Sequence, residues 1–225
     1  MNPITELRIE MDDETHVREA LPAASLSILR GAGADLSRLF QLAAVHRTLW
    51  ALEDSARSRK ALAEAISKVK RAIDVENGRR HALIDDFDES YAFAAPSGQP
   101  CLVSETPGEL GDRLLILALK IRKAREHADD TTLREDLRRH CGLALARLTS
   151  WRDHLVHCLE CETKDLSQGK VLLPPRREFK MYNQPLLNPV TRQELEDAGT
   201  DPMDADSRVA FQNVCAARPG RRINS

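Results

Sequence analysis

Apolar residues recur at helical spacing through two long stretches without proline, residues 23–95 and 108–173. Because proline breaks helix interiors, each stretch has room for long helices. The pattern predicts helices at about 35–57, 59–94, 106–127 and 132–165, with one further helix near 15–30. Long helices joined by short loops favour an all-α fold, an antiparallel bundle of about four long helices.

Two capping motifs mark where the later helices should begin. In the segment Thr106-Pro107-Gly108-Glu109, a capping threonine precedes a proline at the first helical position and a glutamate at the third. Thr132 and Glu135 have the spacing of a second capping box. These signals predict that the last two long helices begin directly after Thr106 and Thr132.

The distribution of proline also divides the chain into domains. Six of the eleven prolines follow residue 173, which is typical of irregular structure. We therefore expect an N-terminal extension at 1–30, a helical bundle domain at 31–190 and a C-terminal tail at 191–225. This Pro-rich tail is predicted to be irregular and partly disordered, with short helices near 191–198 and 204–217.

Polar residues interrupt the apolar faces of three of the predicted long helices. On each of these helices, a row of charged or polar positions contains an arginine, although the helix is otherwise apolar enough to be central. Buried charges cost several kcal/mol each unless they are paired. The candidate site residues in these rows are Trp50, Glu53, Asp54, Arg57, Asn77, Arg80, Asp88, Glu109, Asp112 and Arg113.

Two interpretations of these rows stay open. In the first, the rows form a structural network in which Glu53 pairs with Arg57 and Glu109 with Arg113, each four residues apart. In the second, the rows face one another and line a polar pocket. Guanidinium groups in such a pocket would suit a phosphate or a carboxylate, and the second interpretation therefore predicts an anionic ligand.

Composition and charge narrow the classes of function. The chain has 225 residues, of which 42% are hydrophobic, enough for a core. Its 33 basic and 35 acidic residues leave a net charge of −2, which gives no general attraction to nucleic acid. No apolar run approaches the ~18 residues of a membrane span. The first twenty residues lack an apolar signal region, and five cysteines do not suggest a disulfide framework, so we expect a cytoplasmic protein.

The segment HLVHCLEC (154–161) resembles a metal site only in composition. Its four candidate ligands are spaced along one helix, with His154 and Cys161 about 10 Å apart at ~1.5 Å per residue. One tetrahedral zinc ion cannot use all four side chains. Cys158 also continues an apolar stripe of its helix, which is typical of a core position. We therefore predict no metal at this segment.

Four blocks of sequence resemble a known family. The blocks are LWALEDSAR (49–57), IDVENGRRHALIDDFD (73–88), ETPGELGDRLLILALKI (105–121) and FKMYNQPLLNP (179–189), and they are similar to the bacterial domain of unknown function 4254 family. The chain departs from the family pattern at His46 and His81, where asparagine is usual, and at Gln184, where aspartate is usual. The resemblance implies a helical fold without an established activity. It further implies a link to glycan assembly, which would suit a phosphorylated or sugar-nucleotide ligand.

Two functions remain as hypotheses. The first is a binding or accessory module whose polar pocket recognises an anionic small molecule. The alternative is a metal-assisted phosphohydrolase or transferase, because Glu109-x-x-Asp112 is similar to the acidic signature of all-α nucleoside triphosphate pyrophosphatases. The paired glutamates that precede this signature in those enzymes are missing here. No cofactor is assigned, and a homo-oligomer is compatible with a tail that could exchange between protomers.

Overall fold

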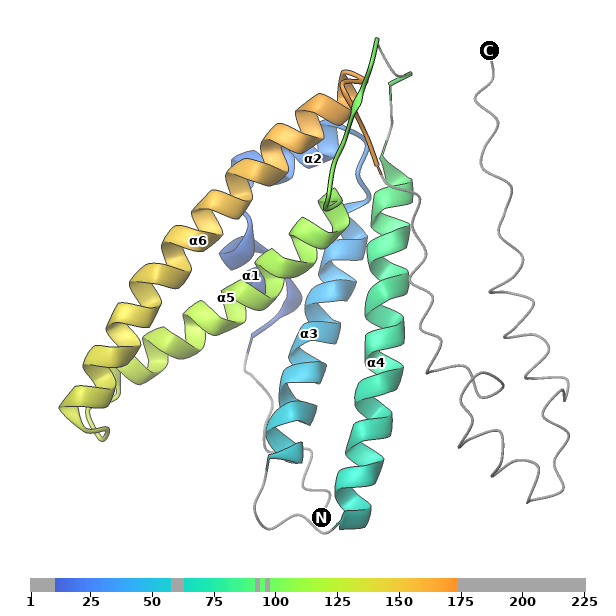
Figure 1. Ribbon diagram of the computed structural model, residues 1–225. Helices are drawn as coiled ribbons and strands as arrows, with labels where there is room; N and C mark the ends of the chain where they lie inside the picture. The colour runs from blue at the N-terminus through green and yellow to red at the C-terminus, as the bar shows by residue number, and fades with distance from the viewer. Residues whose placement is uncertain (1–10, 58–62, 92–93, 96–97, 174–225) are drawn as a thin grey trace, which may run out of the picture. The chain divides into compact units, whose positions relative to one another are not determined.

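The computed structural model describes residues 11–57, 63–91, 94–95 and 98–173 (Figure 1). The elements along this part of the chain are α1 (Asp13–Ala20), α2 (Ala23–Gly31), α3 (Leu36–Ala56), α4 (Ala63–Ser90), β1 (Cys101–Leu102), α5 (Pro107–Asp129), α6 (Glu135–Ser167) and β2 (Val171–Leu172). The predicted all-α fold is confirmed. The chain divides into units 1–175 and 176–225, and every described residue belongs to the first. The predicted tail and its two short helices lie outside the described residues.

Two helical hairpins make up most of the described structure. Helix α3 packs along α4, and α5 packs along α6, as Figure 1 shows. The hairpins meet because α5 also contacts both α3 and α4. The two short helices complete the packing, since α1 contacts α3 and α5, and α2 contacts α6. None of the described helices is long and apolar enough to cross a membrane.

Helix α5 is the centre of this arrangement. Leu110, Leu114, Leu115 and Leu117 of α5 are all at most 3% exposed, and together they point to several sides of the helix. Leu39 and Leu42 of α3, Phe87 of α4 and Leu159 of α6 are among the buried side chains of the same core cluster. The apolar surface around the first four turns of α5 is therefore covered by its neighbours, as its sequence predicts.

The helix boundaries confirm one capping motif and correct another. At the start of α5, the Thr106 hydroxyl accepts a hydrogen bond from the Glu109 amide, and Glu109 accepts one from the Thr106 amide. The capping box predicted at Thr132 was wrong, because α6 begins only at Glu135. Thr132 instead donates both its amide, at 2.9 Å, and its hydroxyl, at 2.6 Å, to the Asp130 carboxylate.

The N-terminal region and the two strands also differ from the prediction. One helix near 15–30 was expected, but Pro22 separates α1 from α2. Strands β1 and β2 were not expected, because two residues are too few to show an alternating pattern. They pair in parallel, with Cys101 opposite Val171 and Leu102 opposite Leu172. This pairing ties the segment before α5 to the segment that follows α6.

Candidate functional site

The centre of the candidate site is a contact among three helices, which we call the arginine junction: His46 of α3, Arg80 of α4 and Asp112 of α5. Arg80 donates from Nε and Nη2 to the two carboxylate oxygens of Asp112, each at 2.6 Å. The Nε2 atom of His46 lies 2.8 Å from Oδ1 of the same carboxylate. Asp112 thus accepts hydrogen bonds from two neighbouring helices, and the junction joins the α3–α4 hairpin to α5.

The arginine junction combines buried and partly exposed groups. The side chains of His46 and Asp112 are each 4% exposed, whereas that of Arg80 is 31% exposed. Burial by itself raises the pKa of Asp112, but the hydrogen bonds from Arg80 and His46 outweigh it and lower that pKa to about 2. The carboxylate is therefore ionised at neutral pH, and it holds the guanidinium of Arg80 in a fixed orientation.

A second buried histidine contacts α5 at Leu115, three residues after Asp112. His16 of α1 is fully buried, and its Nε2 lies 2.8 Å from the backbone carbonyl of Leu115 in α5. Arg47 of α3 approaches the other ring nitrogen of His16 at 3.5 Å and also pairs with Asp13. Burial lowers the pKa of His16 to about 4, so its ring is neutral at physiological pH. His16 was not among the candidate residues, because no polar row was traced along the helix expected near 15–30.

Two of the predicted site residues accept hydrogen bonds from backbone amides at the beginning of α5. Asp88 of α4 is 8% exposed and accepts a hydrogen bond from the Gly108 amide at 2.7 Å. Glu109 closes the capping box with Thr106. Both acids therefore satisfy amide groups in the first turn of a helix, where negative charge is favourable. Their contacts show that these two positions have a structural task.

Close to this helix end lies a group of acids that we call the acidic cluster: Asp88, Glu105 and Glu162. Burial raises the pKa of Glu162 to about 7, and the negative charges of Asp88 and Glu105 add to the shift. Arg113 of α5 pairs with Glu105, and its guanidinium carbon lies 5.7 Å from the ring centroid of Trp151. Neither Glu105 nor Glu162 belongs to the polar rows, so neither was a candidate site residue.

The remaining predicted residues lie further along α3 and α4. Arg57, whose side chain is 72% exposed, is 3.4 Å from the Glu53 carboxylate and 3.8 Å from that of Asp54. Trp50 and Asn77 are partly buried.

The three arginines of the prediction thus contact different carboxylates: Arg57 contacts Glu53 and Asp54, Arg80 contacts Asp112, and Arg113 contacts Glu105. This arrangement is the one expected of structural ion pairs. That the polar rows line one pocket for an anion stays a prediction.

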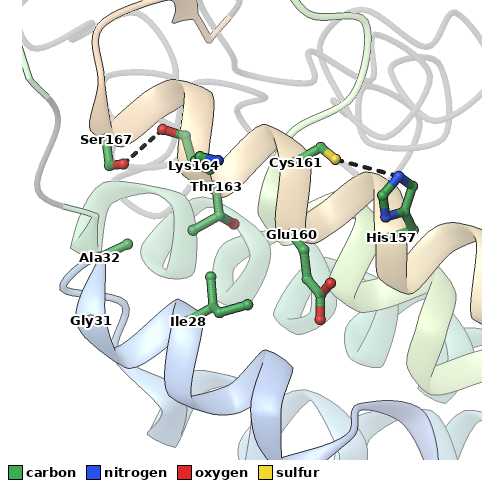
Figure 2. Close-up of a pocket in the computed structure, with 9 residues that line it drawn as sticks. All are labelled: Ile28, Gly31, Ala32, His157, Glu160, Cys161, Thr163, Lys164 and Ser167. Carbon is green, nitrogen blue, oxygen red and sulfur yellow. Dashed lines mark hydrogen bonds between the residues drawn. The ribbon is translucent and has the colours of Figure 1, made fainter.

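A separate hollow of about 410 Å³ lies between α2 and α6 (Figure 2). Its lining comprises Ile28, Gly31, Ala32, His157, Glu160, Cys161, Thr163, Lys164 and Ser167. In HLVHCLEC, the Cys161 sulfur is 3.6 Å from Nε2 of His157, and the Cys158 sulfur is 3.7 Å from Nε2 of His154. Within the described ranges, no group of three or more histidine, cysteine or acidic side chains is arranged to hold a metal ion.

Comparison with known families identifies the larger part of the chain. The family described as "Protein of unknown function (DUF4254)" matches residues 37–174, and the chain belongs to this family. The match runs from α3 to the residues just after β2 and includes all three members of the arginine junction. The searches of curated proteins and of solved structures found no match.

Proposed function

We propose that this DUF4254 protein is a binding module that recognises an anionic small molecule, either a phosphorylated metabolite or a nucleotide sugar, at the arginine junction. The observation that supports this is the state of Arg80. Its guanidinium is fixed by a carboxylate that is almost completely buried, yet about a third of its side chain is exposed. Asp112 takes the Nε and Nη2 donors on one edge of this guanidinium, which orients its other edge in advance for the oxygens of an anion.

In this proposal, His46 and Asp112 are positioning residues. Both side chains are too deeply buried to touch a ligand directly. Their hydrogen bonds reduce the number of orientations available to Arg80, which lowers the entropy lost when an anion binds. This division of roles favours recognition over catalysis, because a general acid or base must come within hydrogen-bond reach of its substrate.

Trp50 and Asn77 would contact the remainder of the ligand. Trp50 lies one helical turn after His46 in α3, and Asn77 lies about one turn before Arg80 in α4. Because α3 and α4 form a hairpin, these steps lead in the same direction away from the junction. An indole face and an amide group beside a guanidinium suit a ligand that carries a ring as well as a phosphate.

Thermal melts of the full chain test the proposal. Wild type should show a higher Tm with millimolar phosphate, pyrophosphate or a nucleotide sugar, and the stabilisation should reach roughly 2.7 kcal/mol at a hundredfold excess over the Kd. Arg80→Lys should lose most of this ligand-dependent shift, because an ammonium cannot bind the Asp112 carboxylate with two parallel hydrogen bonds and also present a second edge of donors to the anion. Arg57→Lys is the matched control, since Arg57 is exposed at the end of the same hairpin, and it should keep the full shift.

Each shift is measured against the same variant without ligand, so that a loss of stability in Arg80→Lys does not imitate a loss of binding. Circular dichroism at 20 °C shows whether that variant is folded before the ligand is added. Absence of a shift in wild type with all three anions would contradict the proposal. Equal shifts in wild type and in folded Arg80→Lys would place the anion elsewhere.

A cytoplasmic location also belongs to this proposal, supported by the four free cysteines among the described residues.

A further inference from the structure

The hollow between α2 and α6 contains a thiol, a base and a cation on adjacent turns of one helix. Cys161 is exposed, and its sulfur lies 3.6 Å from Nε2 of His157, one turn earlier (Figure 2). Lys164 follows Cys161 by three residues and lines the same hollow. Residues at this spacing share one face of a helix, so the three groups act on the same space.

We propose that this hollow is a modification site, in which Cys161 forms a mixed disulfide with a low-molecular-mass disulfide that carries carboxylates, such as glutathione disulfide. The inference is independent of the anion site at the arginine junction. It concerns a different helix pair and residues that take no part in the proposed anion site.

The volume and lining of the hollow fit a small polar molecule. Its volume of about 410 Å³ lies within the range of small-molecule sites, which is roughly 300–1,000 Å³. Ile28 of α2, 40% exposed, and Ala32 give one side an apolar surface. Thr163 also lines the hollow; its side chain is 1% exposed, and its hydroxyl lies within reach of the Tyr91 side chain.

The charges around the thiol favour a carboxylate. Lys164 brings an ammonium group to the hollow, and the His157 ring supplies a further N–H donor on the same helix face. Glu160 is the one acid that lines the hollow among the described residues, and it accepts a hydrogen bond from the Ser25 hydroxyl at 2.6 Å. In Figure 2 the Glu160 carboxylate points away from the Cys161 sulfur, toward the side of α2. The space next to the thiol is thus bordered by donors and a positive charge.

The other described thiols lack this combination. Cys158 has a histidine at the same spacing, but it is partly buried and packs against the hydrophobic core. Cys141 is also partly buried. Cys101 is exposed, but it lies in β1 and outside the hollow. Among the described cysteines, Cys161 alone combines exposure, a neighbouring histidine and a place in the hollow.

The reaction is a thiol–disulfide exchange. The Cys161 thiol gives its proton to His157, and the resulting thiolate attacks one sulfur of the small disulfide. A new bond forms between Sγ of Cys161 and that sulfur, while the sulfur–sulfur bond of the reagent breaks. The second half of the reagent leaves as a thiolate and takes up the proton. Cys161 is oxidised, and one half of the reagent is reduced to a thiol.

The test follows adduct formation on reduced, full-length protein by peptide mass spectrometry. Glutathione disulfide supplies carboxylates, and cystamine is a disulfide of similar reactivity that carries amines instead. In wild type, the Cys161 peptide should gain the glutathione adduct faster than any other cysteine peptide. Cys161→Ser should remove this fast phase, whereas Cys158→Ser should keep it. Cys158→Ser is the matched control, because it alters the other Cys–His pair of the same helix.

Two further variants test the chemistry of the hollow. Lys164→Gln should slow the reaction of Cys161 with glutathione disulfide by about threefold at low ionic strength, without slowing the reaction with cystamine. His157→Gln should slow both reactions, because it removes the base. Modification of Cys101 as fast as Cys161 in wild type would overturn the proposal. So would an equal effect of Lys164→Gln on both reagents, because the hollow would then not select carboxylates.

Discussion

The arginine junction and the acidic cluster both surround the first turns of α5, and both bury carboxylates, yet their electrostatics are opposite. At each place burial pushes the carboxyl pKa upward. Asp112 nevertheless ends with a pKa of about 2, whereas Glu162 ends with one of about 7. The difference lies in the neighbours, since Asp112 faces an arginine and a histidine, and Glu162 faces two more acids. What surrounds a buried acid therefore decides the direction of its pKa shift.

The two regions should also affect stability in opposite ways. In the arginine junction, the folded state holds Asp112 ionised and paired, which stabilises the protein at neutral pH. In the acidic cluster, ionising Glu162 next to Asp88 and Glu105 costs free energy in the folded state. Removing one partner of the arginine junction should therefore destabilise the protein, whereas removing the charge of Glu162 from the acidic cluster should stabilise it.

Arg80→Met should give the largest effect and tests the first half of this comparison. The change leaves the Asp112 carboxylate without its bidentate partner at a position that is 4% exposed. Breaking a buried ion pair in this way costs about 3–5 kcal/mol of unfolding free energy, measurable by urea titration.

The double variant Arg80→Met/Asp112→Leu should recover a large part of that loss, because neither charge is then left alone. His46 would keep its ring but lose its acceptor, so recovery should be incomplete. A double variant as unstable as the sum of the two single changes would contradict the view that Arg80 and Asp112 form one compensated unit.

Gly108→Ala tests how tightly the α4 side of the cluster holds α5. A Cβ at this position would lie 2.9 Å from both carboxylate oxygens of Asp88 and 2.8 Å from the backbone oxygen of Ile84. Such overpacking should destabilise the protein by about 1–3 kcal/mol. The control is Gly78→Ala in the middle of α4, where a Cβ meets nothing within 4 Å.

The control should behave in the opposite way. Alanine is the better helix former by roughly 0.5–1 kcal/mol, so Gly78→Ala should raise the unfolding free energy in the same urea titration. If Gly108→Ala also stabilised the protein, the contact between the Asp88 carboxylate and the first turn of α5 would be looser than the structure indicates.

The sequence was sufficient to predict the long helices, but it predicted where they begin and end less well. Thr106, Pro107 and Glu109 predicted the start of α5 because a capping box is a local motif, formed by residues that lie within one turn. Thr132 failed as a cap because it lies in a local turn before the helix, where its amide and hydroxyl both donate to Asp130, and α6 begins only at Glu135. The pairing of β1 with β2 joins residues about 70 positions apart, and a two-residue strand leaves no periodic signal that would reveal it.

The candidate site shows the same limit more strongly. Arg80 and Asp112 were both singled out, because polar residues on apolar helix faces are visible in the sequence. Their contact depends on how α4 crosses α5, which no local pattern encodes. His46 was noted as a departure from the family pattern, and it was not among the candidate residues. Glu162 had no signal, because only the approach of α6 to the start of α5 makes its position unusual.

The acidic cluster, together with His16, predicts how the stability of the protein depends on pH. Glu162 has a folded pKa of about 7, above its ordinary value of about 4.5, so its stabilising contribution is full below pH 4.5 and is lost as the pH rises through 7. His16 has the opposite sign. Its folded pKa is about 4, below the ordinary 6.5, so stability is lost as the pH falls from 6.5 toward 4. Between pH 4.5 and 6.5 the two groups partly cancel.

Glu162→Gln should remove this cancellation, because it leaves only the His16 contribution. Of the three substitutions at Arg80, Gly108 and Glu162, it should have the smallest effect on stability. Above pH 7 the variant avoids a charge beside Asp88 and Glu105, and it should be more stable than wild type by about 1 kcal/mol, since solvent screens a partly exposed carboxylate. At pH 4.5 the gain should vanish, because the wild-type side chain is then neutral in the folded protein. Urea titrations at pH 8, 6.5, 5.5 and 4.5 should therefore show a steeper acid-side loss of stability in Glu162→Gln than in wild type, since the slope from His16 is no longer offset. Parallel curves for the two proteins would mean that Glu162 does not feel the acidic cluster, and the contrast with Asp112 would then rest on the arginine junction alone.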